Sequence, residues 1–386
     1  MKRFGLLAAL ALAGVASAQS VTVIPDNAAK LRQVGAEILF WSQQQRDQNF
    51  REMEKIFPGH VVKAGTKVRL LPNGKPLPIA EADVKAGMID LNVAGLIVVQ
   101  DGKVRLERYG LGYGPQGRWT SFSVAKSFTS TLVGAAIRDG YIKSIEDPVT
   151  RYIPDLAGGG YDGVTIRQLL SMTSGVKWNE DYTDPQSDVA RMFSNEVPAG
   201  QDPTVWYMKK LPRESEPGTK WVYKTGETNL IGVLVERATK KTLSDYLTEK
   251  VWKPWGMERD AFWMTNPVGS EVSGCCLSVS LRDYARMGMF ALSGGKGVVP
   301  DDWFAQATVS QIPASPDFKG GAGYGYQWWV QPGARFAAIG IFGQSILIDP
   351  AKKLVVVMSG SWPTATGQKL SAARADFWKK IEAATD

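Results

Sequence analysis

The sequence predicts an α+β fold, in which helices flank an antiparallel sheet built from both ends of the chain and a helical insertion separates the two groups of strands. Strand-like segments begin after residue 89 and return after residue 320. The chain between them carries apolar residues at helical spacing instead. With 386 residues, the chain is long enough for one large domain or two packed domains.

The first residues are typical of a secretory signal peptide. Lys2 and Arg3 give a basic start, residues 4–15 are small and apolar, and Ala16-Ser17-Ala18 fits the small-x-small rule of a cleavage site. The apolar run is too short to span a bilayer. We therefore expect residues 1–18 to be removed and the mature protein to be periplasmic or secreted, without stable insertion into a membrane.

The segment after the signal, residues 19–88, is expected to be helical and extended, with a helix over residues 40–57. A β-hairpin follows. Residues 94–99 and 104–109 have strand character, and Asp101-Gly102 lies between them. Because Asp-Gly is a preferred pair for a type I′ turn, this spacing predicts two adjacent antiparallel strands.

Helical spacing dominates the middle of the chain, and β-rich segments return in its last third. Helices are expected over residues 126–138, 165–172, 229–238, 243–252 and 371–384, and strands over residues 324–330, 337–347 and 354–358. The predicted sheet domain comprises residues 89–122 and 265–386, and the helical domain comprises residues 123–264. A catalytic cleft is expected between the two.

Charge and histidine content exclude several classes of function. The formal net charge of +7 falls to +5 without Lys2 and Arg3, and the remaining charges are scattered, so we expect no nucleic-acid partner. His60 is the single histidine, which leaves a Ser-His-Asp triad without a second candidate. Cys275 and Cys276 are adjacent rather than spaced as ligands, so we expect no metal and no cofactor. Hydrolytic chemistry would need another group to move the proton.

Ser123-Val124-Ala125-Lys126 is a candidate for that chemistry. At the start of a helix, positions i and i+3 share one face, so an amine would lie beside the hydroxyl that it activates. The positive end of the helix would favour the alkoxide. The alternative is a capping serine and a solvated surface lysine. Ser174-Gly175-Val176-Lys177 has the same spacing, but no helical run follows it, so it indicates a turn.

Tyr223 ends a short extended segment after Pro217-Gly218, where its hydroxyl could reach the cleft. A nearby ammonium such as that of Lys126 would favour the phenolate and make it a usable base. The alternative is a packed aromatic ring whose hydroxyl finds one partner. We interpret Lys224-Thr225-Gly226, which overlaps this segment, as a coincidental match to a Lys-Thr-Gly motif.

The stretch from Ile339 to Gln344 is a third candidate, expected on a late strand. Its glycines allow close approach of a substrate backbone. An N–H group of that strand, together with the N–H of Ser123, could form an oxyanion hole. The alternative is a glycine-tolerant strand at a tight packing contact.

Together these elements resemble the serine β-lactamase-like superfamily, in particular its class C, esterase and 6-aminohexanoate-dimer hydrolase branch. Ser123-x-x-Lys126 matches the first motif, Tyr223-Lys224-Thr225 takes the place of Tyr-x-Asn, and residues 340–344 match the third motif in the form without a leading Lys or His. The stretches at residues 165–175 and 281–288 are also typical of that family. The resemblance covers roughly residues 89–384 and implies the β-lactamase/transpeptidase-like fold.

The resemblance also implies roles for individual residues. Ser123 would be the acylated nucleophile, Lys126 the base or Ser-activating amine, and Tyr223 the proton shuttle to the leaving group. The N–H groups of Ser123 and Ile341 would form the oxyanion hole. The further residues that it places against substrate are Tyr182, Thr225, Gly340, Phe342 and Gly343.

Departures from the family pattern reduce the range of substrates that we expect. Thr225 replaces the Asn of the second motif, Ala338-Ile339-Gly340 replaces Lys-Thr-Gly, and Ser187-Asp188 is followed by Val189 instead of Asn. These changes argue against efficient β-lactam hydrolysis. The sequence therefore predicts an exported serine hydrolase that cleaves a small-molecule amide or ester of another kind.

Two other functions remain open alongside this one. The first is a penicillin-binding acyl transferase or D-amino-acid peptidase. The second is a non-catalytic protein that binds the cell wall on the same fold. The sequence also leaves open whether Lys126 or Tyr223 is the resting base, and whether Cys275 and Cys276 are two packed thiols or a vicinal disulfide.

Overall fold

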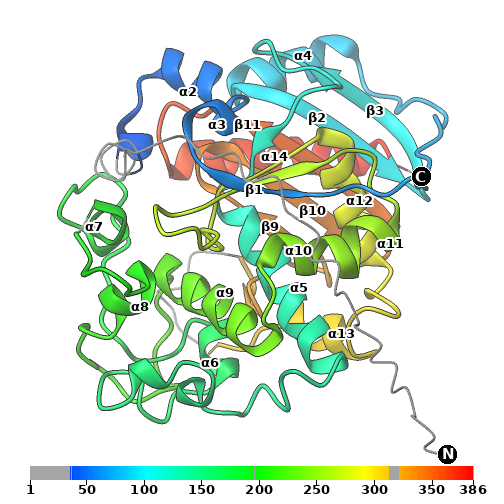
Figure 1. Ribbon diagram of the computed structural model, residues 1–386. Coiled ribbons are helices and arrows are strands. Elements are labelled where there is room, and N and C mark those ends of the chain that lie inside the picture. The colour runs from blue at the N-terminus through cyan, green and yellow to red at the C-terminus, as the bar shows by residue number, and fades with distance from the viewer. Residues whose placement is uncertain (1–34, 36, 195, 313–320, 386) are drawn as a thin grey trace, which may run out of the picture.

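The computed structural model describes residues 35, 37–194, 196–312 and 321–385, so the expected signal peptide lies outside the described residues. The described chain forms two antiparallel sheets surrounded by helices (Figure 1). None of its helices combines the length and the apolar character that crossing a membrane requires.

The larger sheet has seven strands in the order β3-β2-β11-β10-β9-β8-β7, and every neighbouring pair is antiparallel. Its strands are β2 (Val93–Gln100), β3 (Lys103–Tyr109), β7 (Gly323–Tyr324), β8 (Trp329–Val330), β9 (Phe336–Ile339), β10 (Ser345–Asp349) and β11 (Leu354–Gly360). The early strand β2 pairs with the late strand β11, so the predicted sheet built from both ends of the chain is confirmed.

The hairpin β2–β3 forms at the predicted turn, where Asp101 and Gly102 both adopt positive φ angles of 49° and 73°. Type I′ geometry needs this conformation at both central residues, which explains the Asp-Gly pair. Strand β2 is buried along its whole length because helices cover both faces of the sheet.

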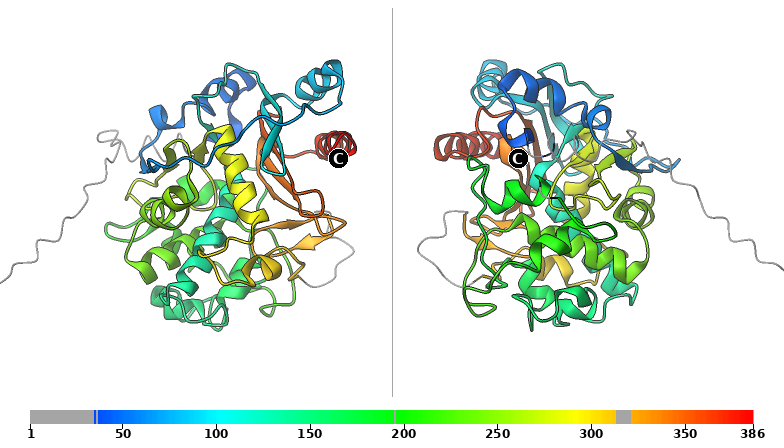
Figure 2. Two further views of the ribbon diagram at one scale, coloured as in Figure 1. Left: turned by 90° about the vertical axis from the view of Figure 1, so that its right-hand side faces the viewer. Right: turned by 60° about the vertical axis from the view of Figure 1, so that its left-hand side comes forward.

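Alternate residues of the central strands enter two separate cores. Ile97 and Val357 pack toward α5 (Ala125–Arg138) and α12 (Leu281–Leu292). Leu96 and Val356 pack toward α4 (Glu81–Asp90) and α14 (Gln368–Ala383). Figure 2 shows α4 and α14 on one side of the sheet and α12 on the other.

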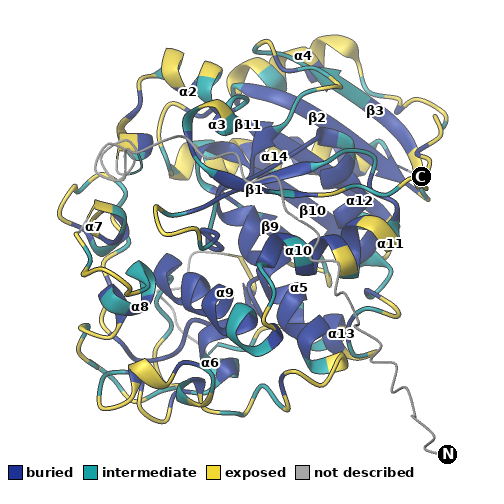
Figure 3. Ribbon diagram, in the orientation of Figure 1, coloured by how far each residue is buried: buried dark blue, intermediate teal, exposed yellow. Residues whose placement is uncertain are grey.

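The helical region is organised around α5 and α9 (Thr225–Thr239), which pack against each other. Its shorter helices are α6 (Ile166–Leu170), α7 (Asp188–Ser194), α8 (Pro203–Met208), α10 (Leu243–Leu247), the π-helical turn η5 (Thr248–Trp252), α11 (Lys253–Trp255) and α13 (Trp303–Ala307). Four short 3₁₀ turns lie in the first half of the described chain, η1 (Ile38–Phe40), η2 (Phe122–Val124), η3 (Val149–Arg151) and η4 (Pro154–Leu156). Figure 3 shows that α5 and α9 are largely buried, which suits helices placed in the interior.

A second, smaller sheet was not predicted. Its order is β1-β5-β6-β4, formed by β1 (Gly59–Val62), β4 (Trp119–Thr120), β5 (Ala261–Met264) and β6 (Leu277–Val279). Strands of two to four residues are too short to show an alternating pattern. This sheet matters for the site because β4 leads directly into residue 123, and β6 follows directly after residues 274–276.

Three expected elements differ from the structure. The helix predicted over residues 40–57 is two helices, α2 (Gln43–Asn49) and α3 (Met53–Ile56). The strand predicted over residues 324–330 is the two short strands β7 and β8. The strand predicted over residues 337–347 is interrupted by the 3₁₀ turn η6 (Ile341–Gly343), because Phe342 has a φ of 58° and cannot continue a strand there.

The close approach of α12 to the larger sheet depends on Gly288. A Cβ atom at this position would lie 2.5 Å from Cγ1 of Val355 and 2.9 Å from Cγ2 of Ile346. We expect Gly288→Val to lower the free energy of unfolding by about 1–3 kcal/mol, because the larger side chain overpacks this contact. Urea denaturation measures it. Met289→Val, at the next and half-buried position, is the control, and equal stability of the two variants would contradict the prediction.

Candidate active site

Ser123 lies in the 3₁₀ turn η2 (Phe122–Val124), between β4 and the first turn of α5. The residue before it, Phe122, has a φ of 41°, which is rare for a bulky side chain and marks a strained turn. Two hydrogen bonds fasten this turn to β6: Ser121 N–H donates to Leu277 O at 2.9 Å, and Leu277 N–H donates to Ser121 Oγ at 3.0 Å. The turn therefore holds Ser123 at the N-terminal end of α5.

Lys126 is fully buried one turn further along, and its Nζ contacts three oxygen atoms from three segments. It lies 3.1 Å from Ser123 Oγ, 3.0 Å from Thr225 Oγ1 and 2.6 Å from Gly274 O. Burial lowers the pKa of Lys126 to about 8, against an opposing effect of the Glu180 carboxylate, which raises it. A substantial fraction of the amine is therefore neutral at slightly alkaline pH.

Tyr223 lies directly before α9 and hydrogen-bonds to Ser123. Its ring centre is 5.2 Å from Lys126 Nζ. Burial and the Glu180 carboxylate raise the pKa of Tyr223 well above its ordinary value, and the hydrogen bond with Ser123 only partly opposes this. Tyr223 is therefore a neutral phenol at physiological pH, which differs from the expectation that Lys126 would favour the phenolate.

The ring of Tyr223 is held by other aromatic side chains. It stacks on Trp329 with 5.5 Å between ring centres and contacts Tyr324 edge-on at 6.1 Å. Trp221 packs against the same group at 6.3 Å from Tyr223. These contacts leave the phenol few alternative orientations. The structure thus brings Ser123, Lys126 and Tyr223 together, from two segments that lie far apart in the sequence.

Residues 340–343 form the turn between β9 and β10 rather than part of a strand. A Cβ atom at Gly340 would lie 2.7 Å from Ser121 O and 3.0 Å from Ser123 N, so only glycine allows this turn to approach the backbone of Ser123 so closely. Ile341 follows directly and borders the space beside Ser123. The turn thereby places the Ile341 backbone next to that of Ser123.

Phe342 and Gly343 occupy positions different from those expected of substrate contacts. The Phe342 side chain is buried against Phe50 and Phe122, with ring centres 5.5 and 5.2 Å apart. Gly343 lies under Trp362, since a Cβ there would be 2.4 Å from Trp362 Nε1. Both residues pack on the core side of the turn. Phe342 does so because its left-handed conformation turns its side chain toward the core.

Glu180, which the sequence analysis did not single out, connects several site residues. Its carboxylate accepts hydrogen bonds from Thr225 N–H at 2.9 Å, from the Thr225 hydroxyl, from Tyr182 Oη at 2.8 Å and from Trp178 Nε1. The Thr225 hydroxyl therefore bridges Lys126 and Glu180. The signal in the sequence was weak, since an acid two residues before Tyr182 has no distinctive spacing.

Most side chains of the other motifs considered from the sequence lie away from the site. Within Lys224-Thr225-Gly226, Lys224 is fully buried and lies 3.7 Å from Glu227, so of its side chains only that of Thr225 reaches the site. In the second Ser-x-x-Lys copy, Ser174 is buried and its hydroxyl donates a hydrogen bond to Glu227, whereas Lys177 is exposed. This arrangement agrees with the turn that the sequence indicated there. His60 lies on β1 with Nδ1 2.8 Å from Glu271 Oε1.

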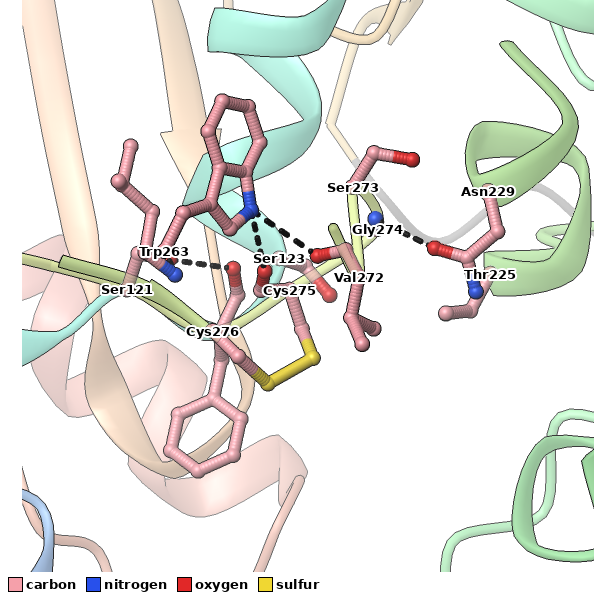
Figure 4. The surroundings of a disulfide bond; sticks show 12 residues. Ser121, Ser123, Thr225, Asn229, Trp263, Val272, Ser273, Gly274, Cys275 and Cys276 are labelled. Atoms are coloured by element: carbon pink, nitrogen blue, oxygen red, sulfur yellow. Dashed lines mark hydrogen bonds between the residues drawn. A yellow bond between two sulfur atoms is a disulfide. The ribbon is translucent and has the colours of Figure 1, made fainter. Parts of the chain in front are cut away.

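Cys275 and Cys276 form a vicinal disulfide, which resolves the two alternatives left by the sequence. The disulfide follows Gly274 directly (Figure 4). Gly274 N–H donates to Asn229 Oδ1 at 2.7 Å, and its carbonyl contacts Lys126 Nζ. The Cys275 carbonyl accepts from Trp263 Nε1 at 3.2 Å. The disulfide therefore lies beside the oxygen that helps to hold the buried amine.

Two hollows meet at Ser123. One, of about 520 Å³, is mainly apolar and is lined by Phe122, Phe193 and the disulfide among others. The second, of about 630 Å³, is lined by Glu180, Tyr223, Trp329, Gly340, Trp362 and Arg374 among others. Ser123, Tyr182 and Ile341 border both. The serine hydroxyl and the phenol thus face space in which a small molecule can bind, and the buried amine contacts the serine hydroxyl.

Comparison with known proteins agrees with this geometry. A model of the family described as Beta-lactamase matches residues 80–377. The chain is 31% identical over 284 residues to the 6-aminohexanoate-dimer hydrolase of Paenarthrobacter ureafaciens, a match that covers 69% of this chain and 72% of the relative. It is 24% identical to Protein flp of Staphylococcus aureus strain MW2 over 53% of this chain and 43% of that protein.

Solved structures show the same fold. The "Putative 6-aminohexanoate-dimer hydrolase from Bacillus anthracis" has a TM-score of 0.76 and 22% identity, and the match covers 88% of this chain and 93% of that one. EstCE1, described as a hydrolase with promiscuous acyltransferase activity, has a TM-score of 0.62 and 16% identity, with 78% of this chain and 97% of that chain covered. The expected β-lactamase/transpeptidase-like fold is therefore confirmed.

The state of the two cysteines can be tested directly. We expect the denatured protein to present no reactive thiol before reduction and two after it, because the sequence contains two cysteines and both are joined in the disulfide. A colorimetric thiol assay in guanidinium chloride measures this, with Cys275→Ser as the one-thiol control. Two reactive thiols in unreduced, freshly purified protein would contradict the structure.

Proposed function

We propose, from the premise that this chain belongs to the Beta-lactamase family of serine hydrolases, that it cleaves a small-molecule amide or ester through an acyl-enzyme on Ser123. One observation carries the proposal. The Ser123 hydroxyl contacts both a buried amine with a lowered pKa and a neutral phenol, at the meeting point of two hollows.

Lys126 acts as the base in the first step. Its amine is 3.1 Å from Ser123 Oγ, and burial lowers its pKa to about 8, so its neutral form can take the hydroxyl proton as Oγ attacks the substrate carbonyl. The Thr225 hydroxyl and the Gly274 carbonyl fix the position of the amine. The Glu180 carboxylate, held by Thr225, stabilises the ammonium that forms.

Tyr223 acts as the acid toward the leaving group. Its raised pKa keeps the phenol protonated, so it gives its proton to the departing amine or alcohol and recovers a proton from the Lys126 ammonium. The N–H groups of Ser123 and Ile341 stabilise the oxyanion. The close approach of Gly340 to Ser123 supports this role, because it brings the Ile341 backbone next to that of Ser123. Water then adds to the acyl carbon, releases the acid and returns a proton to Ser123.

Several features support an amide or ester other than a β-lactam as substrate. Ala338-Ile339-Gly340 places no cation where the third motif of lactamases has one. The relative with 31% identity is a 6-aminohexanoate-dimer hydrolase, which supports activity on a linear amide. We also propose that the protein is exported to the periplasm or beyond, which the signal-like residues 1–18 and the presence of a disulfide support.

The acyl-enzyme can be detected with a fluorophosphonate probe. We expect labelling of the wild type, no labelling of Ser123→Ala, and a loss of ester hydrolysis in Lys126→Ala of about a hundredfold or more, because the serine loses its base. Lys177→Ala, in the second Ser-x-x-Lys copy, is the control that keeps activity. A screen of p-nitrophenyl esters, aminohexanoate amides and a chromogenic cephalosporin measures turnover. Folded wild-type protein that neither reacts with the probe nor hydrolyses any of these compounds would overturn the proposal.

The pH dependence tests the role of Lys126. Because the neutral amine is the active form, kcat/KM for an ester should rise with pH and level off above about 8. Since Glu180 raises the pKa of Lys126, Glu180→Gln should shift the midpoint to lower pH. Asp181→Asn removes the same charge from the neighbouring, exposed position and serves as control. An identical midpoint in all three proteins would contradict this assignment of the base.

A further inference from the structure

The vicinal disulfide lies in the turn that supplies one of the three oxygen contacts of Lys126. Residues 272–276 belong to the link between β5 and β6, and the Gly274 carbonyl accepts from Lys126 Nζ at 2.6 Å, the shortest of the three contacts. This carbonyl shares its peptide group with the N–H of Cys275, which donates to Val272 O at 3.2 Å. Whatever orients Cys275 therefore also orients the oxygen that faces the amine.

Helices α5 and α9 hold the first half of this turn. The Thr129 hydroxyl on α5 donates to Ser273 O at 2.9 Å. Ser273 Oγ donates to Thr228 O on α9 at 3.0 Å. The N–H of Gly274 is fixed by Asn229, also on α9. These contacts end at the Gly274 nitrogen, so the peptide group that carries the Gly274 carbonyl depends on the residues that follow.

The second half of the turn depends on the disulfide, because Cys276 has a φ of 69°. A positive φ is unfavourable for a residue with a side chain. The disulfide closes a small ring around the peptide between the two cysteines and restrains this conformation. Trp263 Nε1 donates to Val272 O at 3.1 Å and to Cys275 O at 3.2 Å (Figure 4). When the ring opens, Cys276 can return to an extended conformation, and the peptide before Cys275 turns with it.

The disulfide faces the active site, where a reductant can reach it. Both cysteines line the mainly apolar hollow of about 520 Å³ that also borders Ser123. Cys275 is half-buried, whereas Cys276 is 2% exposed. None of the described residues that line this hollow carries a charge that would repel a thiolate. Sγ of Cys275 is therefore the sulfur open to attack.

We propose that the vicinal disulfide is a positioning group for Lys126, and that its reduction by a dithiol lowers the activity of the hydrolase. A thiolate of the dithiol attacks Sγ of Cys275, the S–S bond breaks, and Cys276 leaves as a thiolate that takes up a proton. The second thiol of the reductant then displaces Cys275, which is also protonated, and closes a disulfide of its own. Two electrons and two protons thus pass from the dithiol to the protein. This inference rests on the proposed function, and it adds redox control to it.

Reduction of the wild type tests the inference, because the sequence holds no cysteine besides these two. The native protein is treated with dithiothreitol and separated from it by gel filtration under argon, since free thiols cleave activated esters. The free thiols are counted, and kcat/KM is measured with a p-nitrophenyl ester. We expect the high-pH plateau of kcat/KM to fall about tenfold or more, because misplacing a catalytic group by an ångström can cost about a hundredfold. Reoxidation with oxidised glutathione should restore it.

The pH dependence separates a positioning role from a general loss of structure. The Gly274 carbonyl stabilises the ammonium form of Lys126, so its displacement should move the midpoint of kcat/KM to lower pH. Glu180 and Tyr223, which also face the amine, keep their side chains in both redox states. Partial unfolding would lower the plateau without moving the midpoint. A lower plateau with an unchanged midpoint therefore overturns the positioning role.

Two double variants without a disulfide assign the effect to the backbone at residue 276. Cys275→Ser with Cys276→Ser should match the reduced protein and no longer respond to dithiothreitol. Cys275→Ser with Cys276→Gly should recover part of the activity, because glycine adopts a positive φ readily. Equal activities of the two variants, or wild-type activity in the first, would overturn the inference. If neither variant folds, reduction of the wild type remains the deciding measurement.

The outcomes separate this inference from the proposed function. Wild-type protein with two free thiols and undiminished turnover overturns the inference and leaves the hydrolase intact. A disulfide that dithiothreitol does not reduce in the native protein also overturns it. Oxidised wild type that hydrolyses no ester and shows no fluorophosphonate labelling overturns the hydrolase itself.

Discussion

The buried amine of Lys126 is the constraint on which the rest of the site depends. Its three oxygen contacts come from the turn before α5, from the start of α9 and from the link between β5 and β6, so the amine ties together three segments that are far apart in the sequence. Each contact replaces water that burial has removed. The same burial lowers the pKa of the amine toward neutrality. Burial of Lys126 therefore accounts both for the way the three segments meet at its amine and for the lowered pKa that lets the amine act as a base.

Local features were predictable because their causes lie within a few residues. The Asp101-Gly102 turn, the run of helix from residue 126 and the start of α6, where Thr165 and Gln168 form a capping box, all follow from short-range rules. A sheet that takes strands from both ends of the chain was predictable too, because segments rich in β-forming residues need partners; which strands pair, as β2 does with β11, was not.

The site was predictable only in part, because several of its contacts join residues that no local pattern connects. Gly274 and Glu180 contribute a carbonyl and a carboxylate whose importance depends on where the chain folds back. The family resemblance placed Phe342 against substrate, but its positive φ turns the side chain into the core instead. Arg374 resembled any other cation on an amphipathic helix, since the sequence does not show that aromatic rings enclose it.

The approach of Gly340 to the nucleophile has a consequence for how this architecture can vary. A single hydrogen in place of a methyl group sets the clearance between the turn at residues 340–343 and the peptide of Ser123. The side chains that line the two hollows border space, so substitutions among them can reshape the chamber for different molecules. The spacing between these two stretches of main chain has no such freedom. Any change of substrate specificity must therefore leave this spacing unchanged.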